Sequence, residues 1–472
     1  MKKFRILSSI LLCCLLLSSF APAAWALDPP ELDGEAALVV DLDSGRPLYA
    51  MNADQQRAPA SLTKIMTVLL ALEAIERGEI RLDDNITAQD DCREGLGEDS
   101  SSAGILPGVI LSMRELLYCA MVGSANEACN VIGSAIDGSV SAFVDRMNQR
   151  AQQLGCVNTH FVNTNGLPAE GHYSTAWDLY LITTEAMKYP LFMDMANTIE
   201  YQPESEAVNG GKIIHNSNAL ISPGSDYNAY RSYLYEYASG VKTGYTRAAG
   251  YCLISTAEKN DIRVMAIVMG CKGLYNYQLE EFRSFSDTIT LYDWTFDNFA
   301  LRPILRTSDQ VKTVQVAMAR DGGEVILHPQ EDLSLLLPED MADEDIVRET
   351  VVYEDRLTAP LEAGTVLGET HIIINGSEYG SVRLVNQNPV ELARGEYMAN
   401  RLRAFFSNGW VIALLVIILL LAASYIALVT RYRRLRRKHL QERRAREQRR
   451  RQEMEKRKAE QEAMDGNWKD LY

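Results

Sequence analysis

Cysteine and histidine are scarce in this sequence: its 472 residues include eight cysteines and six histidines. No Cys-x-x-Cys motif occurs, and no group of His and Cys residues has the spacing that a metal site requires. The sequence therefore predicts neither a bound metal nor another cofactor. Six cysteines follow the first 26 residues and are scattered through apolar segments, so disulfides and free, partly buried thiols are both open: Cys92, Cys119, Cys129, Cys156, Cys252 and Cys271.

Positive charge is scarce through most of the chain. The formal net charge is −16, and residues 27–409 carry roughly twice as many acidic as basic side chains. Because phosphate groups bind to positively charged surfaces, this composition argues against a nucleic-acid partner. The basic side chains gather instead at the two ends of the sequence, in residues 2–5 and 431–472.

The basic N-terminus has the pattern of a secretory signal peptide. Lys2, Lys3 and Arg5 precede the apolar run "ILSSILLCCLLLSSF", and Ala24 and Ala26 provide small residues at a cleavable bond. We therefore expect residues 1–26 to be a signal peptide that exports the protein. A retained membrane anchor is the alternative.

A second apolar run, "WVIALLVIILLLAASYIALV", contains no charged residue. Twenty residues that rise about 1.5 Å each cover a hydrocarbon layer of about 30 Å, so residues 410–430 are predicted to form a transmembrane helix. The basic segment 431–472 follows at once, and positive residues beside a membrane span remain in the cytoplasm. The sequence thus predicts a single-pass protein of the cell membrane with residues 27–409 outside and a basic cytoplasmic tail, which also suits anionic lipid.

Residues 31–300 alternate strand and helix patterns. The segment "AALVVDLDSGRPLYAMNAD" predicts a hairpin, and helices are expected in the segment that follows it, in "SMRELLYCAMVG" and in "STAWDLYLITTEAMK", the last two each capped by a serine. Strand patterns return in "ASGVKTGYT", "GYCLISTAEKN" and "DIRVMAIVMG". Strands at both ends with helices between predict an α/β (α+β) domain whose antiparallel sheet is closed by its own termini.

The character of the sequence changes after this domain. Short β-type runs and an Asn375-Gly376 hairpin signal predict a small all-β C-terminal domain over residues 308–392. Residues 393–409 are expected to form a juxtamembrane helix that leads into the membrane.

Three short motifs can carry chemistry, and the first is Ser-x-x-Lys. Ser61 and Lys64 are spaced i, i+3, so on a helix their side chains share one face. A serine becomes a nucleophile when a neighbouring base removes its proton, and lysine can act as that base when burial or a nearby cation lowers its pKa. Lys242 is a candidate for that cation. Alone, the pattern favours the simpler interpretation that Ser61 caps the helix.

The second motif is Ser-x-Asn, in "VGSANEACN". Ser124 and Asn126 are expected at a break between two helices, where a hydroxyl and an amide can point together into a cleft. Ser124 would relay a proton, and Asn126 would donate to a substrate carbonyl and accept from Lys64. Here too, a helix cap is the alternative.

The third motif is Lys-Thr-Gly on a predicted strand. Lys242 offers positive charge, and Thr243 offers a hydroxyl for a terminal carboxylate. Gly244 leaves room for another backbone to approach, for example a peptide along the sheet edge. Regular alternation would place Lys242 and Thr243 on opposite faces, so a twist or bulge is expected. A plain surface strand is the alternative.

Together, in this order and in an exported chain, the three motifs resemble those of penicillin-binding proteins and serine β-lactamases. The chain resembles most closely the low-molecular-mass D-alanyl-D-alanine carboxypeptidases, over about residues 31–395. Further segments carry this resemblance in the family's order: "NTHFVNTNGLP", "HYSTAWDL", "HNSNALI" and "SGVKTGYTRAAGYCLISTAE". The resemblance implies a β-lactamase/transpeptidase-like catalytic domain followed by a β domain and a C-terminal membrane anchor.

The resemblance also implies an activity and a mechanism. Ser61 would attack the penultimate D-Ala carbonyl of a peptidoglycan stem peptide, with Lys64 as the base and Ser124 assisting proton transfer. Asn126, Lys242, Thr243 and Gly244 would bind the substrate, and the backbone N–H groups of Ser61 and Tyr245 would form the oxyanion hole. β-Lactams would acylate the same serine. The expected role is in peptidoglycan maturation and cell shape.

Two departures from the family's pattern concern this site. The middle motif has Ala125 where the subfamily often has glycine. An arginine that many relatives place after the last strand is not obvious, so Lys272 or Arg283 is considered as its substitute for the substrate carboxylate. His172 is expected to be structural, because the Ser/Lys pair already provides the chemistry.

Alternative functions remain open at this point. A D,D-endopeptidase would use the same residues. A class A β-lactamase is disfavoured, because no Glu-x-x-x-Asn lies between Ser124 and Lys242. A non-catalytic cell-envelope scaffold is disfavoured by the intact motifs.

Overall fold

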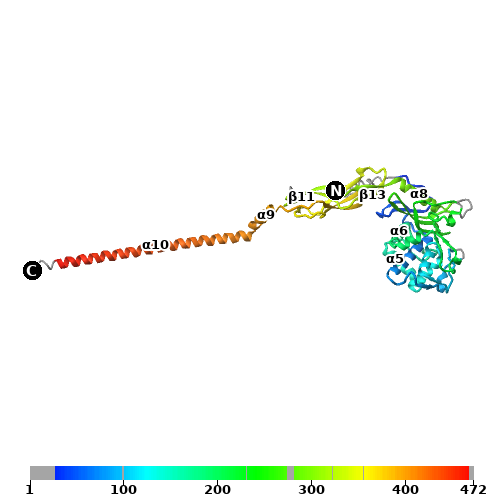
Figure 1. Cartoon of the computed structure of the whole chain (residues 1–472), viewed down its shortest axis with the longest axis horizontal. Coiled ribbons are helices and arrows are strands. Elements are labelled where there is room, and N and C mark those ends of the chain that lie inside the picture. Colours follow the sequence, from blue (N-terminus) through cyan, green and yellow to red (C-terminus); the bar gives the residue numbers. More distant parts are fainter. Residues whose placement is uncertain are drawn as a thin grey trace, which may run out of the picture. The chain divides into compact units, whose positions relative to one another are not determined.

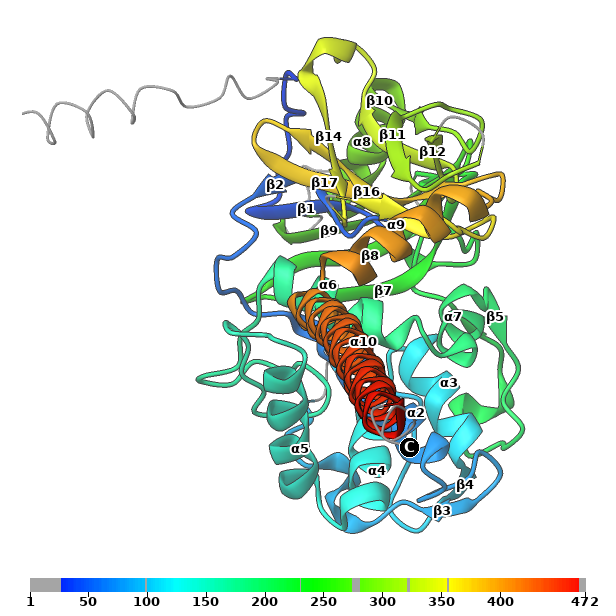
Figure 2. The same ribbon diagram turned by 90° about the vertical axis from the view of Figure 1, so that its left-hand side faces the viewer.

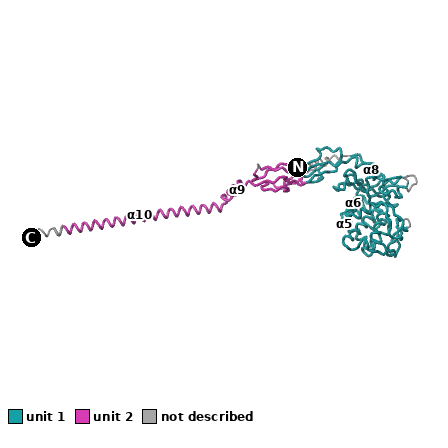
Figure 3. The backbone as a smooth tube through the Cα atoms, in the orientation of Figure 1, with its two compact units in different colours: residues 1–309, 331–349, 370–382 teal, residues 310–330, 350–369, 383–472 magenta. Residues whose placement is uncertain are grey.

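The computed structural model describes residues 27–97, 100–229, 231–273, 281–320, 323–354 and 356–466. The predicted signal peptide and the last six residues of the predicted tail lie outside these ranges. The chain divides into two compact units (Figure 3). Unit 1 comprises residues 1–309, 331–349 and 370–382, and unit 2 comprises residues 310–330, 350–369 and 383–472.

A five-stranded antiparallel sheet forms the centre of unit 1 (Figure 2). Its order is β2-β1-β9-β8-β7, and the strands are β1 Ala36–Asp41, β2 Pro47–Met51, β7 Ala238–Thr246, β8 Gly250–Lys259 and β9 Ile262–Cys271. The N-terminal hairpin β1–β2 thus pairs with the last strand of the domain, in register from Ala36 opposite Met269 to Asp41 opposite Val264. This confirms the predicted hairpin and the predicted closure of the sheet by its own termini.

Alternate strand residues point to opposite sides of this sheet. Apolar residues are buried on both sides, and helices cover both faces. Leu38, Val40 and Ile254 pack into the core formed with the larger helical layer. That layer contains α2 Lys64–Glu76, α3 Met113–Met121, α4 Asn126–Asp137, α5 Val140–Gln153, α6 Ala176–Ala186 and α7 Pro190–Asn197. Val39 and Val264 face the other side, where α8 Arg283–Asn298 contributes Phe285 and Tyr292 (Figure 2). Helix α2 is buried on nearly all sides, so it runs through the middle of the larger layer.

The predicted helix starts are correct for one helix and displaced for another. Ser112 caps α3 by accepting a hydrogen bond from Glu115 N at 3.1 Å. The cap of α6 is Thr175, which accepts from Asp178 N at 3.0 Å, and not Ser174. Ser174 contacts the hydroxyl of Thr159 instead, at 2.8 Å, because the start of the helix lies one residue later than the sequence pattern indicates.

Short elements connect these parts. The strands β3 Asn85–Thr87 and β4 Ile110–Ser112 form one pair, and β5 Glu200–Tyr201 and β6 Ile214–His215 form another. Short 3₁₀ helices are η1 Ala60–Thr63, η2 Asp90–Arg93, η3 Asn209–Gly211, η4 Asp226–Asn228 and η5 Asp343–Asp345.

The segment after α8 is rich in β-strands, as the sequence predicts. Strand β10 Phe299–Leu305 pairs with β13 Leu333–Pro338. A six-stranded sheet has the order β14-β16-β17-β12-β11-β15, with strands β11 Lys312–Ala317, β12 Glu324–Pro329, β14 Ile346–Val352, β15 Leu357–Thr358, β16 Val366–Ile374 and β17 Ser377–Asn386. Asn375 and Gly376 join β16 to β17 with positive φ angles of 51° and 76°, which confirms the hairpin signal.

Unit 2 ends in two helices, α9 Arg394–Ser407 and α10 Gly409–Gly466 (Figure 1). Helix α10 contains the apolar run and is the one helix of the described residues that is long and apolar enough to cross a membrane. It continues without a break into the basic segment, so the predicted span and most of the predicted tail form one helix.

The six cysteines of the described residues are free thiols, and all are buried. Burial raises the pKa of Cys129 to about 11 and that of Cys156 to about 12. The structure therefore contains free thiols and not disulfides at these six positions. The cysteines are buried, whereas the sequence predicted partial burial.

Candidate active site

Ser61 and Lys64 lie at the junction of η1 and α2. Lys64 Nζ is 2.7 Å from Ser61 Oγ and donates a second hydrogen bond to the carbonyl oxygen of Asn165 at 2.9 Å. The residue before α2 is Thr63, and no side chain caps this helix. Ser61 is therefore no helix cap, and its hydroxyl is paired with an amine as the nucleophile hypothesis requires.

The environment of Lys64 favours its neutral form. Its side chain is fully buried, and burial lowers the pKa of Lys64 to about 8, although Cys129 and Glu127 act in the opposite direction. An amine with this pKa is partly deprotonated near neutral pH, so it can accept the proton of Ser61.

Lys242 is also buried, with 1 % of its surface exposed. Burial and the positive charge of Lys64 lower the pKa of Lys242 to about 7. Its amine has one long hydrogen bond, 3.4 Å, to the carbonyl oxygen of Thr243. The positive charge of Lys64 thus disfavours the charged form of Lys242, whereas the lowered pKa of Lys64 itself comes from burial and not from Lys242, the cation that the sequence suggested.

A close approach of two loops fixes Ser61 and its base. Gly166 follows Asn165 with a φ of +91°, and a Cβ there would lie 1.8 Å from the carbonyl oxygen of Ala60. Only glycine fits this position. Gly166 thus brings the Asn165 carbonyl within reach of Lys64, a contact that the sequence analysis missed although it noted the segment "NTNGLP".

Ser124 lies in the predicted break between α3 and α4, and Asn126 is the first residue of α4. Ser124 has a φ of 55°, a conformation that non-glycine residues rarely adopt. The residue before α4 is Ala125 and no side chain caps that helix, so the capping alternative is wrong here as well. The predicted hydrogen bond from Lys64 to Asn126 is also wrong, because Lys64 donates to the Asn165 carbonyl instead.

The neighbouring Glu127 anchors a loop beside the motif. It is fully buried, and its Oε1 accepts hydrogen bonds from Ser102 Oγ at 2.7 Å, Ala103 N at 2.6 Å and Ile105 N at 3.3 Å. Asn126 N donates to the Ser101 carbonyl at 3.0 Å. These bonds hold the serine-rich loop 100–103 against the start of α4.

The Lys-Thr-Gly motif lies on β7, the edge strand of the sheet. A Cβ on Gly244 would lie 3.2 Å from both Ser61 N and the Pro59 carbonyl oxygen. The close approach predicted at Gly244 is therefore present, and the backbone that approaches is the segment before α2. The bulge predicted for the motif is not present there, because the pairing with β8 is regular from Lys242 to Gly244; the irregularity in this pairing lies earlier, between Ser239 and Val241.

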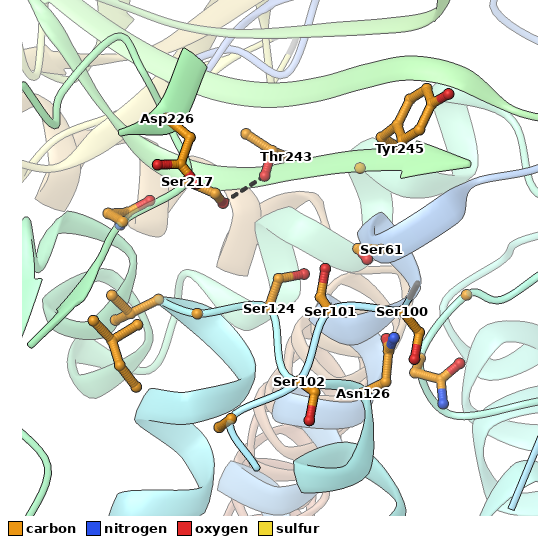
Figure 4. Close-up of a pocket in the computed structure, with 18 of the residues that line it drawn as sticks. Ser61, Ser100, Ser101, Ser102, Ser124, Asn126, Ser217, Asp226, Thr243 and Tyr245 are labelled. Carbon is orange, nitrogen blue, oxygen red and sulfur yellow. Dashed lines mark hydrogen bonds between the residues drawn. The ribbon is translucent and has the colours of Figure 1, made fainter. Parts of the chain in front are cut away.

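These elements enclose one cavity of about 760 Å³ (Figure 4). Six predicted site residues line it: Ser61, Ser124, Asn126, Thr243, Gly244 and Tyr245. Lys64 and Lys242 are buried behind its wall. Ser217, which the sequence analysis did not single out, also lines it, with its hydroxyl 2.6 Å from that of Thr243.

Neither substitute considered for the carboxylate-binding arginine lines this cavity. Lys272 forms an ion pair with Asp33 at 3.0 Å, and Arg283 forms one with Glu281 at 3.2 Å. The arginine that does line the cavity is Arg247. Arg247 lies three residues after Gly244. This closeness to the Lys-Thr-Gly motif is the sequence feature from which its place in the cavity wall could have been predicted.

His172 has a structural role, as expected. Burial lowers its pKa to about 4, so it is neutral at physiological pH. Its Nδ1 accepts a hydrogen bond from Val162 N at 3.0 Å, which leaves Nε2 to donate to Thr63 Oγ1 at 2.9 Å. In the ranges that the structure describes, no group of three or more His, Cys, Asp or Glu is placed to hold a metal ion.

Comparison with known proteins adds a family to this geometry. The family profile of D-alanyl-D-alanine carboxypeptidases matches residues 23–273, and that of the C-terminal domain of penicillin-binding protein 5 matches residues 299–392. The D-alanyl-D-alanine carboxypeptidase DacF of Bacillus subtilis is 32% identical over 374 residues, which cover 77% of this chain and 89% of the relative. The D-alanyl-D-alanine endopeptidase of Escherichia coli is 28% identical over 305 residues, or 62% of this chain and 89% of the relative.

A solved structure has the same fold. Penicillin-binding protein 5 from Haemophilus influenzae superposes with a TM-score of 0.59 at 26% identity, covering 77% of this chain and 99% of that protein. The predicted architecture, a catalytic α/β domain with a C-terminal β domain, is confirmed by these matches.

Proposed function

This chain belongs to the D-alanyl-D-alanine carboxypeptidase family and is a serine-type D-Ala-D-Ala carboxypeptidase, and we propose which of its residues carry out the reaction. Its role is in peptidoglycan metabolism, where such enzymes remove the terminal D-alanine of stem pentapeptides. The observation that carries the assignment is the 2.7 Å contact between Ser61 Oγ and the buried amine of Lys64.

In the first step, neutral Lys64 takes the proton of Ser61 while Oγ attacks the carbonyl carbon of the penultimate D-Ala. The new Oγ–C bond converts the carbonyl oxygen to an oxyanion. The backbone N–H groups of Ser61 and Tyr245 stabilise this charge, since Gly244 lets the two backbones meet closely enough. One such donor typically contributes about 3 kcal/mol to the transition state.

In the second step, the C–N bond breaks and D-alanine leaves. Its nitrogen needs a proton, which passes from the Lys64 ammonium through the hydroxyl of Ser124. Asn126 holds the substrate amide meanwhile. Water then attacks the acyl-enzyme, again with Lys64 as base, and releases the shortened peptide and free Ser61.

The terminal carboxylate of the substrate binds at the other end of the motif. Thr243 and Ser217 present two hydroxyl groups 2.6 Å apart, and protonated Lys242 lies behind them. Binding of the carboxylate favours the charged form of Lys242, so substrate and proton bind to this pocket together.

We further propose that β-lactams acylate Ser61, because their strained carbonyl occupies the place of the D-Ala-D-Ala bond. The protein would be anchored by α10, with the catalytic unit outside the membrane and the basic segment in the cytoplasm, as the distribution of Lys and Arg indicates. A role in cell shape follows from the control of pentapeptide levels.

Mass spectrometry of the detergent-solubilised full chain tests the residue assignment. Benzylpenicillin is expected to increase the mass of the peptide that contains Ser61 by the mass of one benzylpenicillin molecule. A stem pentapeptide is expected to lose one D-alanine. Ser61→Ala should abolish both effects while the protein stays folded. A penicillin adduct on another residue, or D-alanine release by Ser61→Ala, would contradict the assignment.

Endopeptidase activity is a second candidate, favoured by the match to the endopeptidase of Escherichia coli. The same acyl transfer would release a crosslinked peptide in place of D-alanine. Incubation with purified crosslinked dimers distinguishes the two activities, since only an endopeptidase converts dimers into monomers.

A further inference from the structure

Helix α4 begins inside the site, and its second residue, Glu127, is a fully buried carboxylate. Its Oε1 accepts the three hydrogen bonds from Ser102 Oγ, Ala103 N and Ile105 N. Its other oxygen, Oε2, is also buried and has no hydrogen-bond partner in the described part of the chain. Burying a carboxylate costs free energy, which the three hydrogen bonds offset in part. A neutral side chain would avoid the rest of this cost, so the negative charge itself calls for an explanation.

The segment that Glu127 holds forms one wall of the cavity. Residues 100–103 line the cavity, and Figure 4 shows the three serines of this segment with Asn126 on one side and Thr243 on the other. Asn126 N donates to the carbonyl oxygen of Ser101 at 3.0 Å. The hydrogen bonds to Glu127 therefore fix this wall relative to the amide that holds the substrate.

The same carboxylate acts on the base. Burial lowers the pKa of Lys64 to about 8, and Cys129 and Glu127 oppose this decrease. Burial raises the pKa of Cys129 to about 11, so its thiol is uncharged between pH 7 and pH 9. Glu127 is therefore the group whose negative charge favours the ammonium form of Lys64 in this range.

The other titratable groups around this pair do not provide that charge. They are the thiols of Cys92 on η2 and Cys119 on α3, the imidazole of His172 beside Thr63, and the amine of Lys242 on β7. Burial raises the pKa of both thiols and lowers the pKa of His172 to about 4, so all three groups are neutral near pH 8. Lys242, with a pKa of about 7, loses its charge at a lower pH than Lys64.

We propose that Glu127 is a positioning residue of this site, which ties the cavity wall 100–105 to the start of α4 and presents a buried negative charge to Lys64. This inference rests on the proposed function, because it takes Lys64 as the base of acylation. When the proton of Ser61 passes to Lys64, the amine becomes an ammonium group. The fixed carboxylate stabilises that ammonium in the transition state, since attraction between charges is strong in a buried site.

Neutral substitutions of Glu127 in the full chain in detergent test the electrostatic role. Glu127→Gln keeps an oxygen in the place of Oε1, and its amide nitrogen replaces Oε2, which has no hydrogen bond to lose. Without the negative charge, the ammonium form of Lys64 is less stable. The inflection in the saturating rate of β-lactam acylation should therefore move to lower pH by about half a pH unit or more.

Two further results are expected of these variants. The acylation rate on the plateau above pH 9 should fall about twofold to fivefold, because Lys64 becomes a weaker base. Glu127→Met, a second neutral side chain of similar length, should displace the inflection in the same direction, and it decides the question where the glutamine variant does not fold.

Glu127→Asp tests the hold on the cavity wall. It keeps the charge but is one methylene shorter, so its carboxylate no longer reaches all three donors. The inflection should stay near pH 8. Hydrogen exchange at the amides of Ala103 and Ile105, followed by mass spectrometry, should become at least about tenfold faster.

Glu115 provides a matched control. It is a buried carboxylate on α3 whose Oε1 accepts hydrogen bonds from Glu204 N at 2.9 Å and Ser205 N at 3.0 Å. Unlike Glu127, it is not among the groups that act on Lys64. Glu115→Gln should therefore leave the inflection where it is in the unchanged protein.

Three results would overturn the proposal. The first is an inflection at the same pH in the unchanged protein and in the neutral variants of Glu127. The second is unchanged hydrogen exchange in Glu127→Asp, and the third is an equal displacement of the inflection in Glu115→Gln. The proposed function is judged separately, because a benzylpenicillin adduct on Ser61 and release of D-alanine by the unchanged protein support it whatever the variants of Glu127 do.

Discussion

The pH dependence of acylation follows from the burial of Lys64. Because the base must be neutral to take the proton of Ser61, the acylation rate rises as pH increases through the pKa of Lys64, which is about 8. A single titration at this value gives about a tenfold rise in the neutral fraction between pH 7 and pH 9. The saturating rate of acylation by a β-lactam, measured by stopped-flow, should rise by the same factor and level off above pH 9.

Lys242 changes a different quantity with pH. Its pKa is about 7, and its charged form binds the substrate carboxylate, so the affinity should weaken as pH increases through that value. The saturating acylation rate depends on the protonation of Lys64, whereas the β-lactam concentration that gives half of that rate depends on the protonation of Lys242. The saturating rate divided by this concentration should therefore reach a maximum between about pH 7 and pH 8.

The control for this prediction is Lys64→Met, which keeps a side chain of similar length without a basic group. Loss of general-base catalysis typically costs a factor of about 10²–10⁴, and the residual rate should have no inflection near pH 8. A saturating rate in the unchanged protein that stays flat from pH 6 to pH 9.5, or that falls, would refute Lys64 as the base.

Three further predictions concern groups around the same site. Gly244→Ala places a methyl group 3.2 Å from Ser61 N, so acylation should slow by at least about tenfold with little loss of thermal stability; an unchanged acylation rate would show that the strand can yield. Asp226→Asn removes a negative charge from the exposed wall near Thr243 and should lower KM for a pentapeptide about threefold in low salt, and an equal or higher KM would contradict the placement of the terminal carboxylate. The six buried cysteines should not react with Ellman's reagent until the protein is unfolded in guanidinium chloride, so rapid reaction of the native protein would contradict their burial.

Local sequence patterns predicted most of the elements that hold this site. The hairpin at residues 36–51, the strands on either side of Lys259 and the helix break before Asn126 all depend on short-range signals, namely turn residues and apolar periodicity. Closure of the sheet by its termini followed from the order of these elements. The displaced cap at Thr175 shows the usual limit, because neighbouring Ser and Thr residues offer equivalent caps.

Contacts between distant loops could not be predicted in the same way. The Asn165 carbonyl reaches Lys64 because Gly166 packs against Ala60, more than a hundred residues earlier in the chain. Ser217 pairs with Thr243 through a loop that has no regular secondary structure at that residue. Which arginine lines the cavity likewise depends on the path of the chain after β7. This path cannot be predicted from the composition of the sequence.

The two buried lysines show that position, and not pKa alone, decides which residue acts as the base. Lys242 has the lower pKa, about 7 against about 8 for Lys64, so it loses its proton more easily. However, Lys242 lies against its own strand, while the amine of Lys64 lies 2.7 Å from the hydroxyl that must be deprotonated. A neutral amine at the wrong place cannot accept that proton, and a charged one next to Thr243 is useful for binding a carboxylate. Burial and the charge of Lys64 lower the pKa of Lys242, and a bound carboxylate restores the charged form of Lys242, so proton binding there is linked to substrate binding.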